Sequence, residues 1–373
     1  MSVLHKRRRL FRKEVSAYMR YIKEELLTFR RPEKDDWAQI IAPMAGMALC
    51  LLFGYFIGKV SLGGLMTLGL FVFFYYEQMP LRLLLKRLVL VGLLLLFVMF
   101  VSLLCWHFQW TAPMVIGSLA FLCRLFFRLY GMQKPGALFV ILLSAVGVGI
   151  ESNFQSMVGI LGAMSLGVTL GIILAVVVHF TERNSSDYQI DKSNLKERIN
   201  RDPGALMDAL FYAGTLFFAV YLSMGIGLDK PSWMIFSCAG ILQVKNIRAM
   251  MNRNIQRISG TVLGLIVASM ITAVPMSQLM QIFIVVVLYG TLQYCVRVNY
   301  ALGIFVSTPM AILLTTMISN KLTVTSAISN RLIGIVFGCI LGVTAAWVMV
   351  TTLKFYNRKW DLDLEKSEEN DGQ

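Results

Sequence analysis

Charged residues are scarce in this chain: of its 373 residues, only 15% are Asp, Glu, Lys or Arg, whereas 57% are hydrophobic. A soluble domain carries about 25% charged residues on average, so the composition excludes an ordinary cytosolic enzyme. The formal charge of +14 does not indicate a nucleic-acid partner either, because the basic residues stand between long apolar runs. The composition predicts a polytopic membrane protein.

The motifs of metal sites, disulfides and common enzymes are also missing. The six cysteines lie in apolar stretches without a C-x-x-C pair, and the three histidines are scattered, so neither a metal site nor a disulfide framework is predicted. The chain has no G-x-S-x-G elbow, P-loop or dinucleotide fingerprint. We therefore expect no enzyme, no cofactor and no ATP-driven pump within this chain.

Long apolar segments dominate what is present. A helix that crosses a bilayer needs about 20 mostly apolar residues, and by this measure the sequence predicts an all-α integral membrane protein with twelve transmembrane helices. No cleaved signal peptide is expected. The predicted spans are residues 38–58, 61–79, 87–108, 111–129, 135–151 and 157–180, followed after a polar break by 205–226, 231–246, 258–276, 279–297, 299–319 and 331–353.

Basic residues in alternate loops predict the orientation, because Lys and Arg flanking the spans stay in the cytoplasm. The predicted outer segments contain only Lys59, Lys230, Lys321 and Arg331. The other 31 of the 35 basic residues (35 − 4) lie in the N-terminal segment, the inner loops and the C-terminal tail. This asymmetry predicts cytoplasmic termini and a multi-pass protein of the cell (plasma or inner) membrane.

Polar segments divide the chain into five regions. Residues 10–30 place apolar side chains at spacings of three and four beside Lys and Arg, which indicates a helix on the inner membrane surface or, equally, a basic helix that only sets topology. Residues 361–373 are expected to be disordered because they are poor in apolar side chains. The predicted regions are a basic amphipathic cytoplasmic segment (1–36), a first six-helix unit (37–180), a cytoplasmic linker (181–204), a second six-helix unit (205–353) and a cytoplasmic acidic tail (354–373).

The two six-helix units carry similar landmarks at a nearly constant offset of 168–171 residues. This pattern predicts a duplication, and because six is an even number both copies enter the membrane in the same direction, as parallel repeats. The landmark pairs are Ala45-Gly46 and Ala213-Gly214, Gly58 and Gly227, Arg87 and Arg257, and Gly167-x-x-x-Gly171 and Gly338-x-x-x-Gly342.

The stretch Arg257-x-x-Gly260-Thr261-x-x-Gly264 places a positive charge and a strip of small residues on one helix face. Two interpretations remain open at this point. The strip is a helix-packing seam whose arginine only sets topology, or the arginine attracts an anion, since its guanidinium fork matches a carboxylate.

Other charged side chains near the spans lie at span ends, where long side chains reach the membrane interface. For the basic side chains this position favours a role in membrane topology alone. The carboxylates are the available candidates for a proton relay. These residues are Lys86, Arg124, Arg128 and Lys134, and Glu77, Glu151 and Asp208, respectively.

Across residues 205–353 the sequence resembles the fusaric acid resistance protein-like (FUSC) family of the aromatic acid exporter superfamily. In the first half, Arg87-x-x-x-x-Gly92 stands in place of the Gly-Thr motif, and the large cytoplasmic domains that many family members carry are replaced by a short linker and tail. The residues that carry the resemblance are Pro231 and Trp233, then Arg257, Gly260, Thr261 and Gly264, then Asn299-Tyr300-Ala301 with Thr308-Pro309, and finally Arg331 with Gly334, Gly338 and Gly342.

The resemblance implies a secondary exporter of small amphipathic or aromatic carboxylates that is driven by the proton motive force. In this hypothesis Arg257 and Arg331 attract the carboxylate from opposite ends of a pathway between the halves, and Arg87 is the counterpart of Arg257. The glycines are expected to pack helices, and the chain to be a monomer with internal pseudo-symmetry or a homo-oligomer. A passive organic-anion channel and a non-transporting envelope protein are the alternatives. The further residues expected at the substrate are Thr261, Tyr300, Trp233 and Tyr294.

Overall fold

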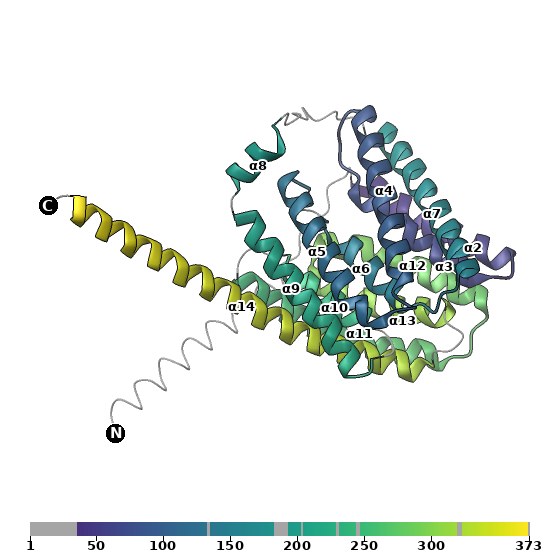
Figure 1. Cartoon of the computed structure of the whole chain (residues 1–373). Coiled ribbons are helices and arrows are strands. Elements are labelled where there is room, and N and C mark those ends of the chain that lie inside the picture. The colour runs from purple at the N-terminus through teal and green to yellow at the C-terminus, as the bar shows by residue number, and fades with distance from the viewer. Residues whose placement is uncertain are drawn as a thin grey trace, which may run out of the picture.

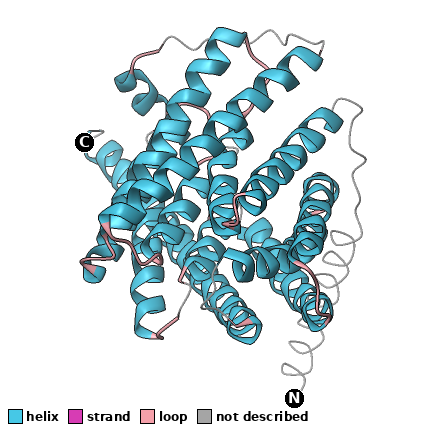
Figure 2. Cartoon of the chain, turned by 90° about the vertical axis from the view of Figure 1, so that its right-hand side faces the viewer, coloured by secondary structure: helices cyan, strands magenta, loops and turns pink. Residues whose placement is uncertain are grey.

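The computed structural model describes residues 36–132, 135–182, 193–202, 204–228, 231–243, 247–318 and 323–371. The predicted surface helix at 10–30 lies outside them. Every regular element in the described residues is a helix (Figure 2). In chain order these are α2 (Asp36–Phe56), α3 (Val60–Gly69), η1 (Leu70–Tyr75), α4 (Leu81–Leu104), η2 (Gln109–Thr111), α5 (Ala112–Leu129), α6 (Leu138–Val148), α7 (Phe154–Thr181), α8 (Leu195–Arg201), α9 (Gly204–Gly225), α10 (Ser232–Ile241), α11 (Ile247–Ala273), α12 (Gln278–Val298), α13 (Tyr300–Ile318) and α14 (Val324–Asp371).

Within the described residues, nine of the twelve predicted spans are helices long and apolar enough to cross a membrane. The other three are the shorter apolar segments Val60–Tyr75, Leu138–Val148 and Ser232–Ile241. At 1.5 Å per residue, the 10 or 11 residues of α10 and α6 cover only about half of the ~30 Å hydrocarbon core. Hydropathy overestimated these segments because it counts apolar residues in turns together with those in helices. The chain is a multi-pass membrane protein.

The last helix, α14, corrects the prediction for the acidic tail. It has 48 residues and continues from its membrane-spanning part, Val324–Thr352, to Asp371, and Figure 1 shows this end projecting from the bundle. Residues 361–371 are therefore helical, where the sequence predicted disorder. Extending an existing helix avoids the unfavourable nucleation step, and the Leu, Glu and Lys residues of this segment have high helix propensity.

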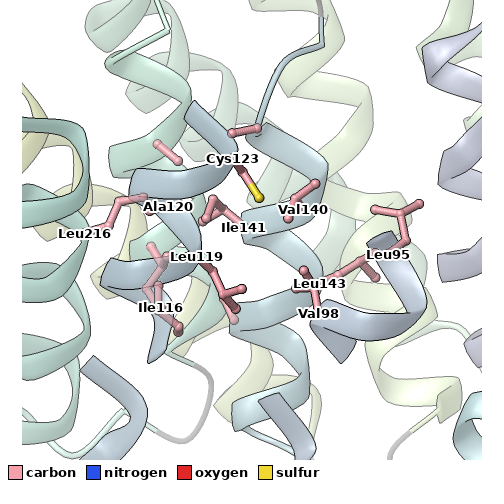
Figure 3. Packing of buried hydrophobic residues seen from close by; sticks show 14 of the residues in the cluster. Leu95, Val98, Ile116, Leu119, Ala120, Cys123, Val140, Ile141, Leu143 and Leu216 are labelled. Atoms are coloured by element: carbon pink, nitrogen blue, oxygen red, sulfur yellow. The ribbon is translucent and has the colours of Figure 1, made fainter. Parts of the chain in front are cut away.

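The main hydrophobic core joins both halves of the chain. Side chains of α4, α5 and α6 interdigitate in it with Leu216 of α9 (Figure 3), and Leu216 is fully buried. The first helix of the second half thus packs into the first half. The first-half residues labelled in this cluster are Leu95 and Val98 of α4, Ile116, Leu119, Ala120 and Cys123 of α5, and Val140, Ile141 and Leu143 of α6.

Several helices of the first half end 169 residues before their counterparts in the second half. Gly58 and Gly227, which lie 169 residues apart (227 − 58), both follow a helix and both have φ of +73°, a left-handed conformation that glycine adopts without steric cost. Three pairs of helices end at the same spacing. The paired final residues are Phe56 of α2 and Gly225 of α9, Leu104 of α4 and Ala273 of α11, and Leu129 of α5 and Val298 of α12.

Helix packing follows the same correspondence. Within the halves, α3 packs on α7 as α10 packs on α14, and α4 packs on α6 as α11 packs on α13. Between the halves the contacts are reciprocal, since α5 packs on α9 and α12 packs on α2. The α5–α9 and α2–α12 interfaces therefore join the halves, together with contacts of α6 with α10 and of α3 with α13.

Glycines permit the close approach of α10 and α14, so we predict that Gly338→Ala lowers the free energy of unfolding by about 1–3 kcal/mol, as overpacking typically does. A Cβ at Gly338 would overlap the carbonyl oxygen of Met234 and lie 2.8 Å from Cβ of Ser237. Gly162→Ala is the control, because no atom lies within 4 Å of a Cβ placed there. Thermal unfolding in detergent measures both variants, and equal stability would contradict the tight contact.

Candidate functional site

Arg257 lies on α11 in the second half and is buried. Its Nε donates a hydrogen bond to Oγ of Ser237 on α10 at 3.2 Å, and its Nη1 donates to the hydroxyl of Tyr300 on α13 at 3.1 Å. The guanidinium carbon lies 4.9 Å from the centre of the Phe236 ring. Gly240 makes room for the group, because a Cβ there would lie 2.8 Å from Nη1. Three helices thus hold this side chain in one orientation.

Arg331 lies on α14 and is also buried, with 5% of its surface exposed. Its guanidinium carbon lies 4.1 Å from the centre of the Trp233 ring on α10, and its Nη2 donates to Oγ1 of Thr308 on α13 at 3.3 Å. Pro309 follows in the same helix and has no N–H, so the carbonyl of Phe305 lacks its usual helix partner. The Nε and Nη1 atoms of Arg331 are buried without a hydrogen-bond partner among the described residues.

The two arginines meet in one junction of four helices, α10, α11, α13 and α14. Their contacts on α10, Ser237 and Trp233, lie one helical turn apart. Neither arginine forms an ion pair with a carboxylate in the part of the chain that the structure describes. Thr261, one turn after Arg257 on α11, is also buried, and its hydroxyl has no partner among the described residues.

Burying unpaired polar groups is costly, and buried polar groups without partners are rare in folded proteins. Two buried guanidinium groups without an acidic partner among the described residues are therefore candidates for contact with an anion. Charged residues inside a membrane bundle typically mark a substrate or ion pathway. We call the junction of α10, α11, α13 and α14 around Arg257 and Arg331 the arginine junction.

The arginine junction differs in place from the sequence prediction. Arg257 and Arg331 were expected at opposite ends of a pathway between the halves, but every contact described above for them lies within the second half. Close glycine contacts explain the difference, since a Cβ on Gly264 would lie 2.6 Å from the carbonyl oxygen of Phe305 and one on Gly334 would lie 3.0 Å from Cβ of Trp233. These contacts turn the arginine-bearing faces of α11 and α14 inward.

The remaining predicted glycines also lie at helix contacts. A Cβ on Gly260 would lie 2.9 Å from the carbonyl oxygen of Ala301, and one on Gly342 would lie 3.3 Å from Cβ of Ile241. In the first half, Gly167 faces the carbonyl of Met66 and Gly171 faces the side chain of Val72. The packing seam and the arginine site of the sequence analysis therefore occupy the same helices.

Two predicted substrate residues lie elsewhere. Arg87 forms an ion pair with Glu77, whose side chain is half exposed, so its charge is balanced near the start of α4. Tyr294 of α12 stacks on Trp37 of α2, with ring centres 6.0 Å apart. Tyr300 and Trp233, in contrast, contact the two arginines directly. Ser237, Phe236 and Gly240 were not predicted, because their spacing on α10 matches that of an ordinary buried helix face.

An ion-pair cluster occupies the α5–α9 interface. Arg124 donates through Nε and Nη2 to Asp208, at 2.8 and 3.2 Å, and through Nη2 to the carbonyl oxygen of Leu242 at the end of α10. Arg128 pairs with Asp202 at 2.6 Å and with Asp208 at 3.0 Å. The sequence predicts a topological role for both arginines. The structure shows in addition that their ion pairs with Asp208 connect the two halves.

The α2–α12 interface has a polar cluster around Glu182, at the end of α7. The carboxylate accepts hydrogen bonds from Nε2 of Gln39 at 2.9 Å and from the hydroxyl of Tyr76 and Nε2 of Gln78, both at 2.7 Å. Burial, and next the hydrogen bond to Glu182, raise the pKa of Tyr76, so its hydroxyl stays a donor. Arg297 of α12 donates to Oε1 of Gln39 at 3.4 Å.

The fold and the arginine junction define a multi-pass membrane protein of transporter-like character. Residues 215–349 match the family described as fusaric acid resistance protein-like, and this is the family that the motifs in residues 205–353 resemble. The matched range contains all four helices of the arginine junction in their apolar parts. No curated protein and no solved structure matched the chain in the corresponding comparisons.

An unpaired buried charge lowers stability, so we predict that Arg331→Met raises the free energy of unfolding by about 1–3 kcal/mol, the typical cost of a buried polar group without a partner. Arg124→Met is the matched control, because Arg124 is paired with Asp208 and its loss should cost about 1.5–3 kcal/mol. Thermal unfolding in detergent without added anion measures both. A clear loss of stability in Arg331→Met would show that Arg331 is structural.

Proposed function

We propose that the protein is a secondary exporter of small amphipathic carboxylates, such as aromatic acids, and that Arg257 and Arg331 bind the carboxylate. The observation that carries the proposal is the pair of buried guanidinium groups without an acidic partner in the described residues, inside the region that matches the family.

The chemistry of the arginine junction suits this cargo. A carboxylate would accept hydrogen bonds from the unpartnered Nε and Nη1 of Arg331, which offsets the cost of burying that charge. The hydroxyl of Tyr300 accepts from Arg257, so its own proton remains available for the same carboxylate. The rings of Trp233 and Phe236 stack on the guanidinium groups of Arg331 and Arg257, respectively, and hold them in place. The same rings provide apolar surface for the apolar part of the carboxylate.

For the membrane arrangement we propose two parallel six-helix repeats with both termini in the cytoplasm. Helix ends at a spacing of 169 residues and the reciprocal packing of α5 on α9 and α12 on α2 support the duplication. The basic inner loops support the orientation in a plasma or inner membrane. Because the contacts of both arginines come from the second half, the proposed pathway runs through that half.

We predict that Arg257→Ala lowers efflux of an aromatic carboxylate, such as benzoate, at least tenfold, since hydrogen bonds to a charged group contribute about 1.5–3 kcal/mol and 1.4 kcal/mol is a factor of ten. Arg82→Ala removes an exposed arginine of α4 and should leave efflux unchanged. Efflux from loaded cells, normalised to the amount of protein in the membrane, is the measurement. If the Arg257→Ala variant is present at normal abundance and its efflux is undiminished, Arg257 serves only helix packing and membrane topology.

Energy coupling separates the exporter from its alternatives. In proteoliposomes, an imposed proton gradient should drive benzoate against its concentration gradient, and a protonophore should abolish that accumulation. Movement that follows only the benzoate gradient would identify a passive channel. No movement that depends on the protein would favour a non-transporting envelope protein.

A further inference from the structure

Arg253 lies one helical turn before Arg257 on α11 and contacts the same tyrosine. Its guanidinium carbon lies 5.0 Å from the centre of the Tyr300 ring, and Arg257 donates to the hydroxyl of that tyrosine at 3.1 Å. Four residues of an α-helix correspond to a rise of about 6 Å. Tyr300 therefore connects two arginines that follow each other along α11, one at its ring and one at its hydroxyl.

Positive charge gathers around Tyr300 without a carboxylate to balance it. In the part of the chain that the structure describes, neither Arg253 nor Arg257 forms an ion pair. The start of α13 at Tyr300 adds the positive end of a helix dipole, which favours a negative charge nearby. Arg253 is partly exposed, whereas Arg257 is buried. A small anion from outside the bundle can therefore reach Arg253 first.

The helices α11 and α13 run in the same direction where they touch. A Cβ on Gly260 would lie 2.9 Å from the carbonyl oxygen of Ala301, and one on Gly264 would lie 2.7 Å from Cβ of Thr308. Residue numbers thus rise together along the contact. Each level of α11 has a partner level on α13, and both helices lead from Tyr300 into the interior.

This parallel contact puts the arginines in a fixed order. Arg253 and Arg257 both contact Tyr300, the first residue of α13. Arg331 donates to Thr308, which lies eight residues further along that helix (308 − 300). At 1.5 Å per residue this is a rise of about 12 Å. The partly exposed Arg253 therefore marks one end of the row and Arg331 the other.

A polar group also lies between these two levels. Thr261 follows Arg257 by one helical turn, and its buried hydroxyl has no partner among the described residues. Thr308 differs, since its hydroxyl donates to the carbonyl oxygen of Ile304, four residues earlier in its own helix. Such a bond to the preceding turn is common for threonine in helices. The hydroxyl of Thr261 is thus left available to a group that is not part of the described chain.

We propose that Arg253 and Tyr300 form the cytoplasmic entry site of the export pathway. The cargo carboxylate binds there first, then at Arg257, and passes Thr261 to reach Arg331. The cytoplasmic position of this end of α11 follows from the basic residues at its start. The inference rests on the proposed function and adds to it the entry residue and the direction of passage.

Exchange of labelled for unlabelled benzoate tests the proposal in membrane vesicles that contain the full-length protein. Inverted vesicles present the cytoplasmic face to the labelled benzoate, and right-side-out vesicles present the outer face. We expect Arg253→Gln to raise the benzoate concentration for half-maximal exchange about tenfold in inverted vesicles, the effect of losing one hydrogen bond to a charged group. The same concentration in right-side-out vesicles should stay at the wild-type value, because cargo that enters from that face meets Arg331 first.

Two further variants guard the result. Arg82→Gln removes an exposed arginine of α4 and should leave both half-maximal concentrations unchanged, which controls for the loss of one surface charge. Arg253→Lys keeps the charge but loses the planar group that stacks on Tyr300. It should show a smaller rise, again in inverted vesicles only, and it replaces Arg253→Gln if that variant does not reach the membrane.

The sidedness of the effect separates an entry site from a structural role. An unchanged half-maximal concentration in inverted vesicles, or an equal rise at both faces, would overturn the inference and leave the proposed function standing. If wild-type vesicles exchange no more benzoate than vesicles from cells that lack the protein, the proposed function fails, and this inference fails with it.

Discussion

Close contact between helices through glycine is the constraint on which this structure depends. In a bilayer, apolar side chains gain little by leaving lipid for the protein, so helices associate where small residues let their backbones approach. Gly264 brings α11 onto α13, and Gly334 and Gly338 bring α14 onto α10. Because these contacts set the rotation of each helix, they also decide that Arg257 and Arg331 face the interior and not the lipid.

The distribution of charge follows from that packing. At the α5–α9 interface, Arg124 and Arg128 of the first half pair with Asp208 of the second half, and Arg128 also pairs with Asp202 of the linker, so both arginines are neutralised. In the arginine junction, no described carboxylate pairs with either guanidinium group. The ion pairs at the α5–α9 interface link the halves. The buried, unpaired guanidinium groups of the arginine junction lower the stability of the fold. Such a loss of stability is most readily tolerated where an external anion compensates the buried charge.

The two halves share a helix register but differ in chemistry. In the first half the interior between α4, α5 and α6 is filled by Leu, Val, Ile and Phe side chains, and Arg87 is paired with Glu77. In the second half, α10, α11, α13 and α14 enclose the buried residues Arg257, Arg331 and Thr261. One half thus supplies a packed apolar support and the other a polar interior, which agrees with the family match over residues 215–349 only.

Hydropathy was sufficient to predict an all-helical membrane protein, and the motif resemblance was sufficient to predict the family that residues 215–349 match, because these properties depend on residues close together in the chain. Sequence reasoning could not place Arg331 beside Trp233, pair Arg87 with Glu77 or shorten α6 and α10 to half a span. Those outcomes depend on which helix faces meet, and that is decided by contacts between segments far apart in sequence. The sequence by itself therefore determined which segments are apolar enough for the membrane and which charges they carry, whereas only the tertiary structure decided which of those charges pair with a carboxylate and which have none among the described residues, because pairing depends on which helix faces meet.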